Sequence, residues 1–427
     1  MSVAARPRPR IAALPRLLRP SGEPTSLDAH LAQYGRLPAL RGESDALIAE
    51  LEASGLRGRG GAGFPTHLKL RAVAGRRAPV VVANGVEGEP PSHKDKLLMR
   101  SNPHLVLDGA EAAAAAVGAR QIVIAVARGA AGAHDSLASA IAERPSGRSH
   151  AQIELAELPD RFVAGEETAL VQWLNGGPAK PAFVPPRPYE KGVRGRPTLV
   201  QNVETLANIA LIARHGASWF RRLGSEAEPG SLLVTVGGGV GRPGITELEA
   251  GTSLRAALER CELDDTPQAL LVGGYFGTWV PFARALDAPL SNAGLRPLGA
   301  SLGARSITVL PATRCGVAET ARIADYLACE SAGQCGPCVF GLRALADALA
   351  SLAACDMDAP AALARLRRIA PQVAGRGACA HPTGATRLVE SALAVFADEI
   401  AHHLAGHCSA RARVPVLPSP RRPVEWR

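Results

Sequence analysis

The cysteines of this sequence have the spacing that most clearly indicates chemistry. Cys335 and Cys338 form a C-x-x-C pair on a turn that contains Gly and Pro, and Cys379 precedes a second turn with a Pro. Two thiolates on a tight turn can bind one metal centre, and soft thiolates select zinc or an iron–sulfur cluster. A thioredoxin-like redox pair would need a βαβ setting, whereas the surrounding pattern is helical. Unligated core cysteines remain the alternative.

A second candidate site is a loop rich in glycine. Four glycines fall within six residues, namely Gly58, Gly60, Gly61 and Gly63. They satisfy G-x-G-x-x-G, but a helix rather than a strand leads into them, so the dinucleotide-fold interpretation fails on context. Such a loop still lets the backbone approach a phosphate, and Arg59 and Lys69 add positive charge. A flexible turn without a ligand is the alternative interpretation.

Acidic side chains occupy two further loops. Asn84, Glu87 and Glu89 directly follow an apolar run typical of a buried strand. Ligands of open α/β sheets bind at this edge, where amide and carboxylate groups can hydrogen-bond a ribityl chain or a ribose. Glu166 and Glu167 follow Gly165 at the start of an expected helix. A solvated acidic turn and a favourable helix dipole are the alternative explanations for the two loops.

The elements that must position these residues follow from the apolar pattern. Apolar runs at 78–84 and 121–126 predict buried strands, and residues 43–55 and 108–117 predict helices. Strands that alternate with helices predict a parallel α/β layer, whereas short strands with glycine turns predict a β-grasp-like fold. Leucines at three- and four-residue spacing near the C-terminus predict a four-helix bundle that carries the cysteines at its end. The predicted organisation is a tail at 1–25, an α/β domain at 26–227, a β-grasp domain at 228–312, a helical domain at 313–408 and a tail at 409–427.

The composition excludes several classes of protein. The net charge is +9, but residues 1–20 carry five arginines without an acid, and residues 411–427 carry five arginines against Glu425. These ends account for the whole excess, so no basic groove for nucleic acid is expected. Both ends are rich in Pro, and we expect them to be disordered. No apolar run approaches the ~18 residues that span a bilayer, and the eight cysteines form no disulfide framework. We expect a cytoplasmic location, which includes a position at the periphery of a membrane complex.

Taken together, these segments resemble the flavin-bearing, NADH-binding subunit of respiratory complex I and its soluble relatives in hydrogenases and formate dehydrogenases. The matching segments occur in the family order over roughly residues 50–405. They are 55–66, 84–90 with Lys94 and Asp95, 165–170, 197–198, 202–206 and 330–338. Residues 66–70 and the 84–90 loop are also similar to the NADH-site subunit of the Rnf electron-transport complex.

The resemblance implies three parts and two cofactors. The first domain would bind FMN and NADH, the second would be a ligand-binding β-grasp (SLBB-like) module, and the third would carry a 4Fe–4S cluster. The implied cofactor-binding residues are Gly58, Arg59, Gly60, Gly61, Gly63, Phe64, Lys69, Asn84, Glu87, Glu89, Phe162, Gly165, Glu166, Glu167 and Asn202. Adenine would lie near Phe64 and Phe162, and nicotinamide near Glu167, the implied catalytic residue. Hydride would pass from NADH to FMN, and single electrons would leave through the cluster to a ferredoxin-like or complex I-like partner.

Three positions depart from the family pattern. Ala332 stands where the family has the first Cys of C-x-x-C-x-x-C, so Cys335, Cys338 and Cys379 are the matched cluster ligands. Val86 replaces an Asp that contacts the flavin, and Ala72 replaces an aromatic residue near adenine. The fourth iron of the cluster could lack a protein ligand. Cys329 is a tentative ligand for it, and Cys315 is another candidate. The cluster could also be absent, which would favour a non-catalytic docking or ligand-binding subunit.

Overall fold

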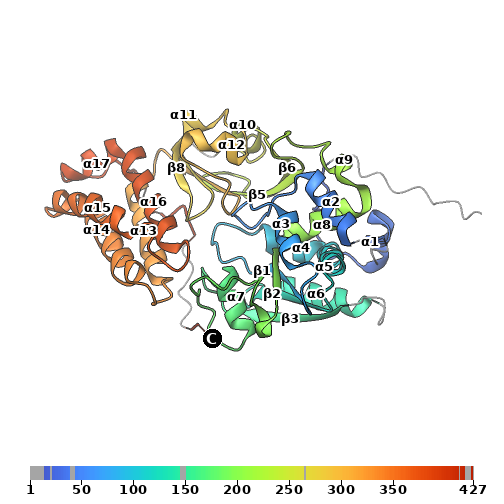
Figure 1. Ribbon diagram of the computed structural model, residues 1–427. Helices are drawn as coiled ribbons and strands as arrows, with labels where there is room; N and C mark the ends of the chain where they lie inside the picture. The colour runs from blue at the N-terminus through green and yellow to red at the C-terminus, as the bar shows by residue number, and fades with distance from the viewer. Residues whose placement is uncertain are drawn as a thin grey trace, which may run out of the picture.

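The computed structural model describes residues 14–19, 22–38, 44–144, 151–263, 266–412, 414–418 and 425–426. Two sheets and a set of C-terminal helices follow one another along the chain. In Figure 1 the first sheet and its helices lie on the right, the second sheet lies above the centre, and the C-terminal helices lie on the left.

The first sheet is parallel, as the alternation of strands and helices predicts. Its strand order is β3-β2-β1-β4, and every neighbouring pair is parallel. The bounds are β1 (Val80–Gly85), β2 (Gln121–Ala127), β3 (Gln152–Leu158) and β4 (Thr198–Asn202). Val80, Val81 and Val82 have no exposed surface, because helices cover both faces of this sheet. The carboxyl ends of β1 and β4 therefore meet at one edge.

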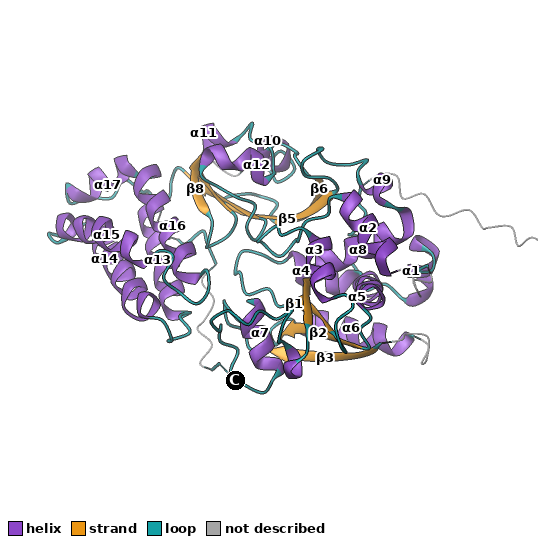
Figure 2. Ribbon diagram, viewed as in Figure 1, coloured by secondary structure: helices purple, strands orange, loops and turns teal. Residues whose placement is uncertain are grey.

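Helices surround this sheet in the right-hand part of Figures 1 and 2. They are α1 (Leu27–Tyr34), α2 (Ser44–Ser54), α3 (Thr66–Val73), α4 (Lys94–Ser101), α5 (Pro103–Val117), α6 (Ala131–Glu143), α7 (Glu167–Leu174), the short 3-10 helix η1 (Val193–Gly195), α8 (Val203–His215) and α9 (Ala217–Phe220). The helices α5 and α8 approach closely at Gly109, where a Cβ atom would lie 1.8 Å from the Leu206 carbonyl oxygen. That contact fixes α8, whose N-terminus carries part of the candidate site.

The second sheet is mixed and has the order β6-β5-β9-β7-β8. Its strands β5 and β9 are parallel, and its other neighbouring pairs are antiparallel. The elements are β5 (Ser231–Gly238), β6 (Gly244–Glu249), α10 (Leu254–Leu258), β7 (Pro267–Val272), β8 (Thr278–Pro281), α11 (Phe282–Ala285), α12 (Asn292–Leu295), the 3-10 helix η2 (Arg296–Leu298) and β9 (Ser306–Pro311). The figures place this sheet between the first sheet and the C-terminal helices (Figure 2).

The remaining helices pack around a core of their own. They are α13 (Gly316–Cys329), the π-helical turn η3 (Pro337–Leu342), α14 (Arg343–Ala354), α15 (Ala359–Val373), α16 (His381–Val395) and α17 (Ala397–Leu404). Leu345, Leu349 and Leu352 on α14 are at most 1% exposed. Among the described residues, one stretch, Pro337–Ala354, is long and apolar enough to cross a membrane, contrary to the expectation of no such run. Its leucines pack against other helices of this chain, as in the core helix of a globular domain.

The described residues near both ends of the chain are packed, so the expectation of disorder is wrong for them. Leu17 is fully buried, and the backbone N–H groups of Arg16 and Leu17 donate to Glu247 Oε2 at 2.7 and 2.8 Å. Leu417 is 3% exposed, and the Trp426 ring lies 4.1 Å from the Arg161 guanidinium. Residues 1–13 and 419–424, on which that expectation also falls, lie outside the described residues.

The buried N-terminal contact predicts a measurable contribution to stability. Leu17→Ala leaves a cavity in the core of the first domain and should reduce the free energy of unfolding by about 2–5 kcal/mol, measured by urea denaturation. Leu404→Ala is the matched control, because Leu404 is 39% exposed and its truncation should cost much less. Equal stability of the Leu17→Ala protein and the unmodified chain would mean that the N-terminal segment is not anchored.

Candidate functional site

The site begins where β1 and β4 end, since their register places Asn84 beside Asn202. The Asn202 side chain caps α8, because its Oδ1 accepts from the backbone N–H groups of Glu204 and Thr205 at 3.0 and 3.4 Å. Asn84 Nδ2 donates to the Gly165 carbonyl oxygen at 2.8 Å. The predicted residues Asn84, Gly165 and Asn202 are thus brought together at one edge of the first sheet.

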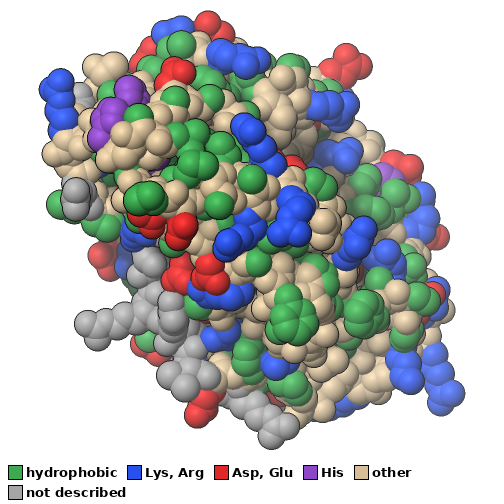
Figure 3. All heavy atoms as spheres, turned by 90° about the vertical axis from the view of Figure 1, so that its left-hand side faces the viewer, with side chains coloured by type: hydrophobic (Ala, Val, Ile, Leu, Met, Phe, Trp, Pro, Cys, Tyr) green, Lys and Arg blue, Asp and Glu red, His purple; other side chains and the backbone are tan. Residues whose placement is uncertain are grey.

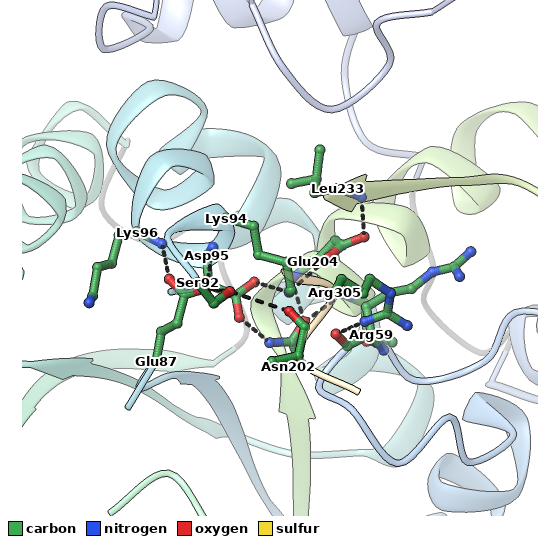
Figure 4. Close-up of polar contacts among 12 residues, drawn as sticks. Arg59, Glu87, Ser92, Lys94, Asp95, Lys96, Asn202, Glu204, Leu233 and Arg305 are labelled. Atoms are coloured by element: carbon green, nitrogen blue, oxygen red, sulfur yellow. Dashed lines mark hydrogen bonds and ion pairs between the residues drawn. The ribbon is translucent and has the colours of Figure 1, made fainter. Parts of the chain in front are cut away.

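A buried lysine lies next to this edge (Figure 4). Lys94 Nζ is 2.7 Å from Asp95 Oδ1 and 2.8 Å from Glu204 Oε2, and all three side chains are nearly fully buried. Burial opposes the charge on Lys94, but the two carboxylates outweigh it and raise the pKa of Lys94. The pKa of Glu204 is lowered, because Lys94 and two arginines outweigh the effect of its burial. Asp95 Oδ2 also accepts from Asn202 Nδ2 at 2.7 Å, which ties the network to the strand end.

Glu87 is committed to the start of α4. Its Oε1 accepts from Ser92 Oγ at 2.5 Å, and its Oε2 accepts from the Lys96 backbone N–H at 3.2 Å. Figure 4 shows the Glu87 side chain on the α4 side of this group. Glu87 therefore stabilises the start of α4 even without a bound cofactor. This role is additional to the binding role expected of it.

The glycine loop keeps free donors close to Asn202. Among the described residues, no group accepts a hydrogen bond from the backbone N–H groups of residues 60–63. A Cβ atom on Gly60 would lie 3.1 Å from Asn202 Cβ, so a side chain there would press on Asn202. Gly61 and Gly63 have φ values of +112° and +61°, which other residues rarely adopt. A concave backbone with unpartnered N–H groups can bind an anionic phosphate.

Two arginines hold this loop through hydrogen bonds. The backbone N–H of Arg59 donates to Thr205 Oγ1 at 2.8 Å, and its buried guanidinium donates to the Pro229 carbonyl oxygen at 3.2 Å. Burial lowers the pKa of Arg59 to about 10. Arg305 donates to the carbonyl oxygens of Arg59 and, at 3.3 Å, Gly58. The Arg59 guanidinium, expected to add charge at a phosphate, is thus buried and bonded to Pro229. Arg305 was not predicted, and nothing in its sequence context marks it.

The open side of the site carries a weak ion pair. Lys69 Nζ lies 3.3 Å from Glu167 Oε2, and both side chains are about one-third exposed. Glu166 Oε2 caps α7 by accepting from the backbone N–H groups of Thr168 and Ala169 at 2.9 and 3.1 Å. Burial raises the pKa of Glu166. Of these polar side chains, Lys69 and Glu167 remain accessible to a ligand.

The two aromatic residues expected near adenine lie in different surroundings. Phe64 is 47% exposed. The Phe162 ring lies 4.6 Å from the Phe276 ring and 6.0 Å from the Tyr326 ring, measured between centroids. Phe162 therefore joins the site to the second sheet and to the C-terminal helices, whereas Phe64 is free to contact a ligand.

Glu89 lies in the contact between the first domain and the second sheet. Its Oε1 accepts from the Tyr275 backbone N–H at 2.8 Å. Burial raises the pKa of Glu89 to about 8, so the carboxyl group is mostly protonated at neutral pH. The side chain expected to bind a cofactor thus contributes to the packing between the two sheets.

The raised pKa of Glu89 predicts a pH dependence of stability. A free glutamate has a pKa near ~4.3, so unfolding between that pH and about 8 releases a proton. Stability contributed by Glu89 is therefore lost as the pH rises through this range. In Glu89→Gln the melting temperature should fall less between pH 5 and pH 8.5 than in the unmodified chain. Glu226→Gln, at an exposed position, is the control. A Glu89→Gln protein with the same pH profile as the unmodified chain would contradict the raised pKa of Glu89.

The C-x-x-C cysteines and Cys379 line one cavity. Its lining residues are Val163, Pro181, Ala332, Gln334, Cys335, Cys338, Ala378, Cys379 and His381. Burial, with the neighbouring Cys379 and Cys335, raises the pKa of Cys338 to about 12. We call this set of residues the thiol cavity. It brings together the three cysteines predicted as cluster ligands, and Ala332 lines it as well.

Cys329 lies outside the thiol cavity. Its Sγ accepts from Arg343 Nη2 at 3.1 Å, and it is not among the residues that line the cavity. The assignment of Cys329 as a tentative fourth ligand stays a prediction, and in this structure its thiol contacts Arg343 instead of the cavity. His381 is a potential metal ligand that was not predicted from the sequence. Its Nε2 contacts the Leu327 carbonyl oxygen at 2.8 Å, and its buried Nδ1 has no partner among the described residues.

Both implied cofactors fit the residues present. The open amides of residues 60–63, beside Asn202, suit a phosphate group such as that of FMN. Three thiols suit an iron–sulfur cluster, and the same cavity is lined by His381, whose buried Nδ1 has no partner among the described residues.

Comparisons with known proteins agree with this arrangement. Residues 51–211 match the family model described as the Nuo51 FMN-binding domain, and residues 318–403 match the NADH-ubiquinone oxidoreductase-F iron–sulfur binding region. The structure is similar to a chain of an NAD+-reducing NiFe hydrogenase in the H2-reduced state, with a TM-score of 0.74 and 31% identity. That match covers 85% of this chain and 63% of the hydrogenase chain.

Two bacterial relatives match over most of this chain. The chain is 32% identical to the NADH-quinone oxidoreductase F protein of Streptomyces coelicolor over 405 residues, which are 88% of this chain and 87% of the relative. It is 31% identical to the NADH-quinone oxidoreductase F 2 protein of Rhizobium meliloti over 377 residues, which are 84% of this chain and 89% of the relative. The chain therefore belongs to the F-subunit family of NADH-quinone oxidoreductases.

Proposed function

We propose that this chain is the NADH-oxidising subunit of an electron-transfer assembly, with FMN at the edge of the first sheet and an iron–sulfur cluster in the thiol cavity. The observation that carries the proposal is the glycine loop, whose unpartnered N–H groups lie beside Asn202. Residues 26–227 would be the FMN/NADH domain, residues 228–312 an SLBB-like β-grasp domain, and residues 313–408 a four-helix cluster domain.

Each accessible side chain of the site has a role in this proposal. The amides of residues 60–63 bind the flavin phosphate, and Lys69 supplies the positive charge that Arg59 does not. Glu167, one-third exposed and paired with Lys69, orients the nicotinamide, so it is the candidate catalytic residue. Phe64 offers an exposed ring for adenine. Bound FMN would accept a hydride and release electrons singly.

One short segment, residues 161–165, contacts both cofactor sites and is called the bridging segment. Gly165 accepts from Asn84 at the flavin edge, and Val163 lines the thiol cavity. Two residues span at most about 7 Å, so the edges of the two sites are close. The Phe162 backbone N–H donates to Glu330 Oε2 at 2.8 Å, which attaches the segment to the end of α13. The bridging segment thus favours direct electron transfer between the two cofactors.

The electron acceptor is a partner protein in this proposal, either ferredoxin-like or complex I-like. Proteins related to this chain belong, by name, to an NADH-quinone oxidoreductase and to an NAD+-reducing hydrogenase. A peripheral position on such an assembly, on the cytoplasmic side, agrees with the buried leucines of α14. Neither nucleic acid nor a membrane span has a place in this function.

A second candidate is a non-catalytic docking or ligand-binding subunit with a degenerate cluster site. Ala332 in the wall of the thiol cavity favours it, since a thiol is missing there. An anaerobic absorption spectrum of the purified protein before and after NADH separates the two functions. NADH oxidation predicts flavin bands that bleach with NADH. Protein that stays colourless after anaerobic reconstitution with FMN, iron and sulfide would favour the docking function.

The flavin site predicts the effect of a side chain on Gly60. Gly60→Val would place methyl groups against Asn202 and over the open amides, so bound FMN should fall at least about tenfold, measured by flavin absorbance per chain. Gly244→Val is the matched control, because a Cβ atom on Gly244 meets nothing within 4 Å. Full flavin content in Gly60→Val would place the phosphate elsewhere.

The thiol cavity predicts that a cysteine at position 332 stabilises the cluster. Cys335, Cys338 and Cys379 would supply three thiolates, and a cluster held by three thiolates alone would be prone to lose iron in oxygen. Ala332→Cys should therefore lengthen the lifetime of the iron–sulfur absorbance in air, whereas Ala332→Ser should not. Cys338→Ala should lose the iron itself.

His381 tests whether the fourth iron has a nitrogen ligand. If Nδ1 binds it, His381→Ala should change the EPR spectrum of the reduced cluster and shorten its lifetime in air. An unchanged spectrum would mean that the fourth iron has no ligand from His381.

A further inference from the structure

We propose a structural zinc site formed by Cys315, Glu399, His403 and Cys408, separate from the thiol cavity. The four potential ligand atoms all lie within 4.8 Å of one another. Cys315 Sγ lies 3.5 Å from His403 Nε2, which lies 2.9 Å from Glu399 Oε1. In tetrahedral zinc sites with Cys, His and Glu ligands, neighbouring ligand atoms are roughly 3.3–3.8 Å apart. The observed atoms need only small shifts to reach that geometry.

The orientation of His403 favours a metal ion over a plain hydrogen-bond network. Its Nδ1 donates to the Leu352 carbonyl oxygen at 2.9 Å, which fixes the tautomer and turns the Nε2 lone pair toward the other three groups. Without a metal ion, the contact of Nε2 with Glu399 needs a proton between them, on Nε2 or on the carboxyl group. A cation at Nε2 takes the place of that proton and attracts the carboxylate directly.

The two thiols and the carboxylate are also prepared as ligands. Cys315 caps α13, and its Sγ accepts from the Ala318 backbone N–H at 3.3 Å, which holds the sulfur atom at the start of the helix. Glu399 Oε1 accepts from the Ser409 backbone N–H at 3.0 Å, which holds the carboxylate in place. Cys408 is exposed and gives the ion a route of entry.

The site would join three parts of the C-terminal region. Cys315 precedes α13, Glu399 and His403 belong to α17, and Cys408 lies in the chain after α17. That chain continues to Val416, whose backbone N–H donates to Glu319 Oε1 on α13 at 3.0 Å. A zinc ion here would therefore anchor the C-terminal segment at the start of α13.

Exposed histidines near the site provide a control for adventitious metal binding. Figure 3 shows histidine side chains on the surface on the side of the C-terminal helices. His402 Nδ1 lies 3.1 Å from His407 Nε2, and both rings are exposed. These two residues are close to His403 in the sequence but are not members of the proposed site.

The test is the zinc content of the full chain, purified under reducing conditions and dialysed against zinc at a buffered free concentration. One zinc ion per chain is expected, and it should remain in Cys338→Ala, which removes a thiol-cavity ligand, and in His402→Ala. Cys408→Ala, at an exposed position that should not impair folding, is expected to weaken zinc affinity at least about tenfold. His403→Ala should do the same.

Cobalt substitution reports on the ligands independently of flavin or NADH activity. Co²⁺ in the Cys338→Ala background should give tetrahedral d–d bands and a thiolate charge-transfer band, and Cys408→Ala should remove most of the latter. The proposal is overturned if the chain binds no zinc, or if Cys408→Ala retains it with full affinity. It is likewise overturned if mass spectrometry finds Cys315 and Cys408 joined in a disulfide after purification with reductant. Loss of zinc only in His402→Ala would assign the ion to the surface pair.

Discussion

The ammonium group of Lys94, buried between the carboxylates of Asp95 and Glu204, is the interaction on which the rest of the site depends. Removing ions from water costs several kcal/mol each, so such a group persists only where every partner is in place. Its partners come from the first turns of α4 and α8. Glu204 also accepts from the Leu233 backbone N–H at 3.1 Å, so the same network reaches β5 of the second sheet.

The geometry of the sheet edge proposed to bind FMN, at the carboxyl ends of β1 and β4, depends on this network. Asp95 holds the Asn202 side chain, and Asn202 in turn limits the space beside Gly60. The glycine loop is fixed from the other side by Arg305, which directly precedes β9 of the second sheet. The donors proposed to bind phosphate are therefore positioned by residues from both sheets, and either sheet alone would leave the loop unsupported.

Much of the fold could be predicted because its signals are local. The apolar run before Asn84 predicts β1, and its alternation with helices predicts a parallel sheet, which places Asn84 and Asn202 at one edge. The C-x-x-C spacing and Cys379 likewise predict a common thiol site. Long-range contacts without a local pattern could not be predicted. Leu17 lies in a segment whose Pro and Arg content suggests disorder, yet its N–H reaches Glu247, which is 230 residues away. Arg305 and the free nitrogen of His381 depend in the same way on three-dimensional packing.

The contact of Trp426 with Arg161 has a consequence for the order of assembly. Arg161 belongs to the bridging segment and also pairs with Glu330 at 3.2 Å, whereas Trp426 follows Arg161 by 265 residues. A ribosome makes the chain from its N-terminus, so the first sheet can fold long before Trp426 exists. The bridging segment therefore acquires this neighbour long after the strands of the first sheet have been made. Until that moment it lacks the indole ring that packs on Arg161 in the finished protein.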